Sequence, residues 1–178
     1  AEENILTVHG NAQVRATLEE AVRDLATHRL AFHEIRPGEA IDLGEGVSAV
    51  PIPANHKRDE SCVFYLFQAG GVTLLQANDT GWFDDAAWEI LRGYEVDIAV
   101  VDSTSGKIDS RNGHLGCRVV AELRQEMLAQ GILKPRHRFV ANHFSHNGGW
   151  LHDEMEAFFR PHGIEVGYDG MRIPVAAL

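Results

Sequence analysis

The pattern of hydrophobic and polar positions predicts strands and helices that alternate along the chain, separated by short turns. Residues 4–10, 30–36, 46–56, 96–103 and 137–143 read as β-strands. Residues 62–79 read as a hairpin in which two apolar strands meet at Ala69, Gly70 and Gly71. Residues 164–173 predict a terminal β pair around Asp169 and Gly170, because Asp-Gly is a hairpin dipeptide.

Helices are predicted between these strands. Asn11 is expected to cap a helix whose apolar face carries Val14, Leu18, Val22 and Leu25. Further helices are expected at about residues 84–91, 115–130 and 149–163. Hairpins therefore come first and strand-helix alternation follows, which predicts an α/β (α+β) fold, with residues 1–178 as a single unit.

Composition limits the classes of function. The chain has 178 residues, 44% hydrophobic and 24% charged, enough for one ordinary core. It has no apolar run long enough to span a membrane and no secretion-signal pattern at its start, so we expect a soluble, cytoplasmic protein without membrane contact. A net charge of -10 argues against nucleic acid as a partner. Cys62 and Cys117 lie far apart in apolar surroundings and are expected to be core thiols.

Four polar residues share a position at or beyond the end of a predicted strand: His56, Asp79, His114 and His143. Loops beyond buried strands can present side chains to one cleft, and a set of imidazoles with a carboxylate suits zinc, manganese or iron. Each residue also has an ordinary interpretation. Asp79 can close an Asx turn, His56 can be an exposed side chain, His114 can cap a helix and His143 can be a loop residue.

The order of these residues and their flanking sequences resemble a known superfamily. The segments "VPIPANH", "VFYLFQAGGVTLLQANDTGWF", "DSTSGKIDSRNGHLG", "FVANHFSHNGG" and "VGYDGMRI" resemble the second half of a metallo-β-lactamase-fold hydrolase. The resemblance is strongest to the phosphodiesterase of the carbon-phosphorus lyase pathway, with tRNase Z further off. It implies an αββα sandwich and a site that binds two divalent metal ions.

The resemblance also implies roles for individual residues. His56 and His143 match histidine metal ligands, and Asp79 matches the carboxylate that bridges the two metals. His114 matches a histidine that contacts the scissile phosphate, which implies a catalytic role as a general acid. His146 matches a less constant position and is interpreted as a residue beside the ligands or the substrate.

Carboxylates outside the ligand set can orient such histidines, and Asp102 and Asp169 are the candidates. For both, a structural turn is the alternative, and it is favoured for Asp169. Between two metals about 3.5 to 4 Å apart, a water is acidified towards the hydroxide that attacks the phosphate.

One departure from the superfamily pattern changes the expected behaviour. The signature H-x-H-x-D-H, which supplies the remaining metal ligands, does not occur in the sequence, and "ILTVHGN" resembles a segment that follows it. The chain is therefore expected to begin part-way through the family's domain, to bind metal weakly and to be inactive alone. Unpaired strand edges would favour a homo-oligomer or a complementary chain as partner.

The sequence thus predicts that the intact parent is a metal-dependent phosphodiesterase acting on a small or cyclic phosphodiester. A tRNase Z-like 3′-endonuclease is a competing interpretation within the same chemistry, although the acidic balance counts against it. A non-catalytic half-domain used for binding or assembly is the alternative from a different class.

Overall fold

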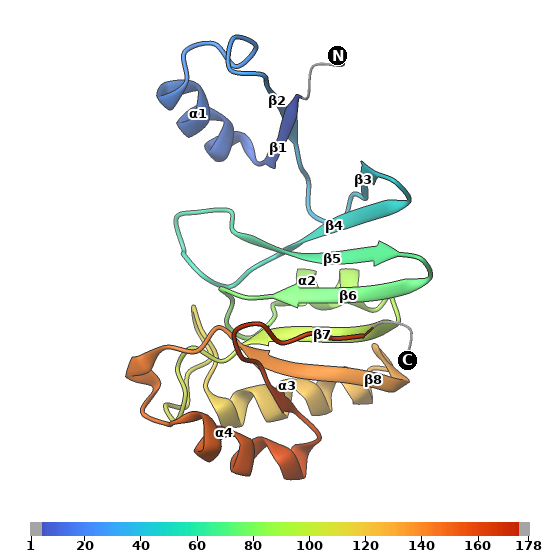
Figure 1. Cartoon of the computed structure of the whole chain (residues 1–178), viewed down its shortest axis with the longest axis vertical. Helices are drawn as coiled ribbons and strands as arrows, with labels where there is room; N and C mark the ends of the chain where they lie inside the picture. Colours follow the sequence, from blue (N-terminus) through green and yellow to red (C-terminus); the bar gives the residue numbers. More distant parts are fainter. Residues whose placement is uncertain (1–4, 175–178) are drawn as a thin grey trace.

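The computed structural model describes residues 5–174, which form a small two-stranded sheet and a large seven-stranded sheet (Figure 1). The small sheet contains β1 (Leu6–Gly10) and β2 (Leu30–Glu34), which are parallel and joined by α1 (Ala12–Ala21). The large sheet contains β3 (Ile41–Gly44), β4 (Val47–Pro53), β5 (Val63–Ala69), β6 (Val72–Ala77), β7 (Val96–Asp102), β8 (Leu133–Asn142) and β9 (Glu165–Val166). Its strands lie side by side in the order in which they occur along the chain.

The first half of the large sheet is antiparallel and the second half is parallel. β3, β4, β5 and β6 pair antiparallel, whereas β6, β7, β8 and β9 pair in parallel. The tight turn between β5 and β6 is made by Gly70 and Gly71, whose φ angles of 56° and 82° suit a two-residue hairpin loop. The parallel strands are connected by α2 (Asp85–Leu91), α3 (Cys117–Ala129) and α4 (His152–Phe159). Two short 3-10 helices, η1 (His146–Gly148) and η2 (Arg160–His162), flank α4. Within the large sheet, the predicted order of antiparallel hairpins first and strand-helix units later is confirmed.

The main core lies between the large sheet and these helices. Alternate strand residues such as Phe64, Leu75 and Phe139 are at most 2% exposed and belong to one hydrophobic cluster with Leu91 of α2 and Leu123 of α3. Burying one apolar side chain of this size contributes about 1.5–3 kcal/mol to the stability of the fold. This packed layer therefore fixes the strands that carry the polar loops at their ends.

The β1-α1-β2 unit stands at the opposite end of the molecule from α4 (Figure 1). Asn11 caps α1 as predicted, since its side-chain Oδ1 accepts a hydrogen bond from the Val14 N–H at 2.9 Å. The helix ends at Ala21, so Val22 and Leu25 lie beyond it, and α1 has no buried residue. The predicted apolar helix face is therefore shorter than expected and remains accessible.

The structure also corrects the sequence-based interpretation elsewhere. The expected β pair at residues 164–173 is half right: β9 forms, Asp169 and Gly170 make a turn, and residues 171–174 are not a strand. β3 was not predicted. Cys117 is buried as expected, but Cys62 is only half-buried. Asn4, the first residue of the first predicted strand, lies outside the described residues. Within residues 5–174, no helix has the length and apolarity needed to cross a membrane.

Candidate metal centre

The carboxyl ends of β4, β6, β7 and β8 meet at one edge of the large sheet. β4 and β6 are both antiparallel to β5, so they run in the same direction, and β7 and β8 are parallel to β6. The segments that follow these strands carry His56, Asp79, His114 and His143. The topology therefore brings the four sequence-predicted site residues to one edge, on the left in Figure 1.

Asp79, Asp102, His114 and His143 form the tightest polar group at this edge. Each offers one donor atom, and these atoms all lie within 4.8 Å of one another. The Nε2 atom of His143 lies 3.6 Å from the Asp79 carboxylate. His56 lies outside this group, but its ring meets the ring of His114 edge-on, with centroids 4.9 Å apart. The sequence placed His114 beside the ligands, whereas the structure puts its ring between those of His56 and His143.

Asp102 is fully buried and is saturated by hydrogen bonds. Its Oδ1 accepts from the backbone N–H groups of Thr104 and Leu115, at 3.0 and 3.1 Å. Its Oδ2 accepts from the Asp79 N–H at 3.1 Å and from His114 Nδ1 at 2.8 Å. The Thr104 hydroxyl also lies 3.1 Å from Oδ2, but its single proton is shared with the His143 carbonyl oxygen at 2.6 Å. The four N–H donors occupy the lone pairs of the carboxylate, so Asp102 fits an orienting role rather than a ligand role.

The three histidines are held in matching ways. His56 Nδ1 donates to the carbonyl oxygen of Gly113 at 3.1 Å. His114 Nδ1 donates to Asp102, and His143 Nδ1 lies 2.8 Å from the Thr104 hydroxyl. A ring whose Nδ1 carries the proton presents an unprotonated Nε2, which is the atom that binds a metal. The hydrogen-bond network thus prepares three imidazole donors and one carboxylate, a set that fits a zinc, manganese or iron ion.

Asp79 and His143 share an uncommon backbone conformation. Their φ angles are 49° and 61°, in the left-handed region that non-glycine residues seldom occupy. Such strain costs on the order of 1–3 kcal/mol for a residue and is concentrated at functional sites, where the surrounding structure holds it. Arg29 and Glu45, in turns away from the site, also have a positive φ, and an Asx turn is compatible with this conformation at Asp79. The conformation therefore bears on the site only because Asp79 and His143 both adopt it and face each other.

Asn55 joins three of the loops that form the site. Its backbone carbonyl accepts from the N–H groups of Gly81 and Gly113, at 2.7 and 3.1 Å. Its side-chain amide donates to the carbonyl oxygens of Trp82 and Arg111, at 3.2 and 3.4 Å. The loops after β4, β6 and β7 are therefore tied together at the residue before His56. Asn55 was not among the residues predicted from the sequence, where its only signal is its position at the end of a β-like run.

In the segment "NHFSHNGGW" after β8, one histidine faces the site and a glycine packs against a neighbouring loop. His143 faces Asp79, whereas His146 is exposed in η1. Gly148 packs against Gly106, where the backbones approach so closely that a Cβ on Gly106 would collide with the Gly148 carbonyl. The Gly148 oxygen accepts from the Lys107 N–H at 2.9 Å, which docks this loop on the loop after β7. Asp169 lies in the turn after β9 and is exposed, as its structural interpretation predicted.

Below the site, Cys117 begins α3 with its Sγ atom 3.5 Å from the Ser103 hydroxyl. Burial raises the pKa of the Cys117 thiol, so it stays neutral and contributes packing rather than a thiolate ligand. The described residues at this edge therefore offer nitrogen and oxygen donors.

Comparison with known proteins places the fold. Residues 1–144 match the family model for the beta-lactamase superfamily domain. The sequence matches no curated protein. The chain is similar to the solved structure of a diphosphatase of the PhnP family, with a TM-score of 0.69 and 20% identity over 96% of this chain and 59% of that one. It is also similar to zinc-bound PqqB from Methylobacterium extorquens, with a TM-score of 0.70 and 16% identity over 98% of this chain and 66% of that one.

A third similar structure is the metallo-beta-lactamase fold protein YhfI from Bacillus subtilis, with a TM-score of 0.68 and 10% identity over 95% of this chain and 63% of that one. The chain thus spans less than two thirds of the length of each of these three proteins. By its sequence match over residues 1–144 and its mixed α/β architecture, the chain belongs to the beta-lactamase superfamily and has the metallo-beta-lactamase fold.

Proposed function

We propose that this chain carries part of the active site of a metal-dependent hydrolase that cleaves a small or cyclic phosphodiester. The observation that supports this most strongly is the group formed by Asp79, His114 and His143, whose donor atoms converge to within 4.8 Å. Membership of the beta-lactamase superfamily and the fold shared with a PhnP-family diphosphatase agree with it.

His56, Asp79 and His143 are the residues that would hold a divalent metal. Such an ion supplies positive charge to phosphate oxygens and acidifies water, which is the chemistry that phosphodiester cleavage needs. Asp79, the only carboxylate of this set, is exposed and can share its two oxygens between neighbouring cations, as the predicted bridging role requires.

His114 would act on the leaving group. Its Nδ1 is committed to Asp102, so the proton that it can give or take resides at Nε2. The buried carboxylate holds the plane of the ring and stabilises the imidazolium that forms when Nε2 is protonated. A protonated Nε2 can donate to the oxygen of the departing alcohol, which is the general-acid role expected from the sequence.

The donor count limits what the chain does alone. With His114 kept for the leaving group, one carboxylate and two imidazoles leave even one tetrahedral site a ligand short, and they fall well below the eight or so donors that two such sites need. We infer that the second metal of a two-metal site takes ligands from outside this set, and that the chain alone binds metal weakly and has little activity.

Hydrolysis of bis(p-nitrophenyl) phosphate with added zinc or manganese tests the proposal in the parent protein. Asp79→Ala is expected to abolish metal-dependent turnover. Asp109→Ala, which removes an exposed carboxylate paired with Arg118, is the matched control and should keep it. Retained turnover in Asp79→Ala would refute the proposed function.

A second candidate is a non-catalytic half-domain that assembles with a complementary chain or with a second copy. It is favoured by α1, which has no buried residue, and by an apolar pocket of about 550 Å³ between α1 and β5, lined by Val14, Leu18 and Tyr65. Light scattering of the purified chain at increasing concentration tests this second candidate, because a chain that stays monomeric at every concentration excludes assembly with a second copy.

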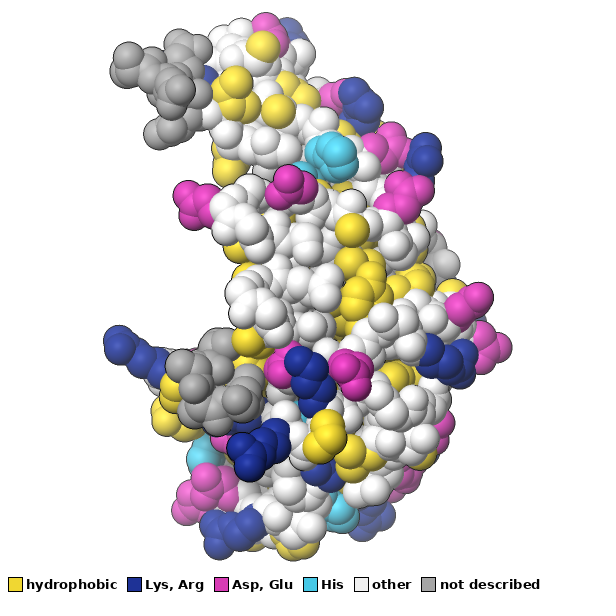
Figure 2. All heavy atoms as spheres, turned by 90° about the vertical axis from the view of Figure 1, so that its right-hand side faces the viewer, with side chains coloured by type: hydrophobic (Ala, Val, Ile, Leu, Met, Phe, Trp, Pro, Cys, Tyr) yellow, Lys and Arg dark blue, Asp and Glu magenta, His cyan; other side chains and the backbone are white. Residues whose placement is uncertain are grey.

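A transfer-RNA endonuclease has less support. The net charge of the chain is -10, which opposes the broad basic surface that binding to RNA phosphates requires. On the side of the molecule turned away from the candidate metal centre, acidic and basic side chains are interspersed (Figure 2).

A further inference from the structure

Exposed apolar side chains gather at the edge that carries the candidate metal centre. Among residues 5–174, seven large hydrophobic side chains are exposed, and three of them follow adjacent strands of the parallel half of the sheet: Ile108 after β7, Leu151 after β8 and Tyr168 after β9. They are 58%, 77% and 62% exposed. Single exposed apolar residues are common, but one on each of three adjoining segments needs an explanation.

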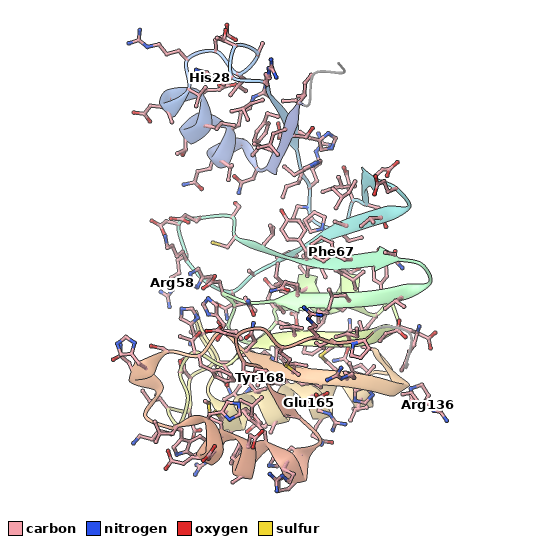
Figure 3. All side chains as sticks on the ribbon, viewed as in Figure 1. His28, Arg58, Phe67, Arg136, Glu165 and Tyr168 are labelled. Atoms are coloured by element: carbon pink, nitrogen blue, oxygen red, sulfur yellow. The ribbon has the colours of Figure 1, made fainter. Side chains whose placement is uncertain are left out.

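The sheet register places Tyr168 beside His143. Val166 of β9 pairs with Ala141 of β8, and the Gly167 N–H donates to the Ala141 carbonyl at 2.8 Å. If this parallel register is continued, Gly167 lies opposite Asn142 and Tyr168 lies opposite His143. The Nε2 atom of His143 faces Asp79. Figure 3 shows Tyr168 at the beginning of the segment after β9, near the ends of β7 and β8.

Tyr168 is held in position while its ring stays accessible. A Cβ on Gly167 would lie 3.0 Å from the Asn142 side chain, so the glycine lets this segment lie close to β8. The Tyr168 carbonyl accepts from the Met171 N–H at 3.0 Å, which closes the turn behind it. On one side the His152 ring packs edge-on, with centroids 6.4 Å apart. A tyrosine fixed in this way loses little conformational entropy when a ligand packs on it.

Space for a ligand adjoins the ring. Tyr168 lines a pocket of about 540 Å³ together with Met171, and the charged side chains of its wall are three arginines and two glutamates, Glu156 and Glu165, which pair with Arg160 and Arg138. This volume lies in the range of small-ligand sites. The loop that carries Ile108 is docked on the loop before Leu151 through the Lys107 N–H and the Gly148 carbonyl, so the apolar residues share one rim.

We propose that Tyr168 is a specificity-determining residue that stacks on a planar ring in the organic group of the phosphate ester, as in a nucleoside phosphate. The phosphate would lie at the metal centre, and the planar ring would cover Tyr168 next to Leu151. This inference rests on the proposed function, because it takes the phosphate of the ester to be bound at Asp79 and His143.

The test compares two probes that differ only in the base. Adenosine 5′-monophosphate and ribose 5-phosphate are titrated calorimetrically into the chain in the presence of zinc. Stacking of one base on an aromatic side chain is expected to make the adenosine ligand bind about tenfold more tightly. Tyr168→Ala should remove that preference while leaving ribose 5-phosphate binding unchanged, and Tyr168→Phe should keep it. Leu43→Ala, which removes an exposed apolar side chain from β3, is the control and should match the wild type.

These experiments distinguish failure of the stacking role of Tyr168 from failure of the proposed hydrolase function. Equal affinity for the two ligands, a preference that survives in Tyr168→Ala, or binding of neither ligand would overturn the stacking proposal. The proposed function is tested by inorganic phosphate: if its binding is independent of zinc and of Asp79, the phosphate site itself is wrong. Zinc-dependent phosphate binding with equal affinity for the two esters would leave the metal centre standing and remove only the role of Tyr168.

Discussion

Replacing Asp102 by asparagine removes the negative charge that accepts hydrogen bonds from the loops after β6 and β7, while it keeps the size of the side chain. One amide oxygen can still accept from Thr104 and Leu115, as Oδ1 does in the native chain. The amide NH₂ then replaces Oδ2 and faces the Asp79 N–H and His114 Nδ1, which are both donors. Two donors that were 3.1 and 2.8 Å from a carboxylate oxygen lose their acceptor.

The magnitude follows from these two contacts. A hydrogen bond to a charged group contributes about 1.5–3 kcal/mol, so two of them amount to about 3–6 kcal/mol. Removing a buried charge recovers part of its desolvation penalty, the Thr104 hydroxyl can turn to accept from the new amide, and His114 Nδ1 can also accept from it once the ring proton moves to Nε2. We therefore expect Asp102→Asn to lower the free energy of unfolding by about 2–4 kcal/mol, a large part of the total stability of an ordinary domain.

Urea denaturation followed by tryptophan fluorescence, in the presence of a chelator, measures this loss. Asp109→Asn is the matched control, because that carboxylate is 55% exposed in its pair with Arg118 and should change stability by less than about 0.5 kcal/mol. Nitrogen NMR adds a local readout: the Nδ1-protonated form of His114 should be lost in Asp102→Asn, while His56, held by Gly113, should keep it. A stability of Asp102→Asn within about 0.5 kcal/mol of the wild type would show that the Asp102 carboxylate does not stabilise these loops.

Three further predictions concern the scaffold. Asn55→Ala should cost about 1–3 kcal/mol in urea denaturation, because its amide bonds to two carbonyls are lost; an unchanged midpoint would contradict its role. Gly106→Ala, at a φ of 54° and against a neighbouring carbonyl, should cost about 2–4 kcal/mol, whereas Gly131→Ala, at a φ of 71° in open space, should cost about 1 kcal/mol in the same assay. In the folded chain a thiol reagent should modify half-buried Cys62 and spare buried Cys117, whose pKa is raised by burial; rapid modification of both would contradict the packing of α3.

Much of the fold is predictable from the sequence because its signals are local. The Gly70-Gly71 turn, the Asn11 cap and the apolar run of β7 each reflect a preference carried by a few adjacent residues. β3 and the segment after β9 escape such reasoning. β3 is a short edge strand that depends on pairing with β4, and residues 171–174 have the composition of a strand without a partner strand that the structure describes.

The site is predictable only in part for the same reason. His56, Asp79, His114 and His143 stand out because each follows a strand, and parallel topology brings such positions together. The residues that hold these side chains in place do not stand out in the sequence. Asn55 acts through backbone carbonyls on two distant loops, and the N–H donors to Asp102 come from segments up to 23 residues away. Local patterns predict which side chains reach an edge, whereas tertiary contacts decide how they are held.

We propose above all that this edge of the sheet holds a divalent metal through Asp79 and His143. Calorimetric titration of the chain with zinc is the direct test, with Asp79→Ala and His143→Ala as variants and Asp109→Ala as control. We expect about one equivalent of zinc, bound with less than the roughly 10 kcal/mol typical of complete structural zinc sites, and we expect this binding to be lost in both site variants. Binding that persists in Asp79→Ala and His143→Ala, or two tightly bound equivalents in the wild type, would contradict it.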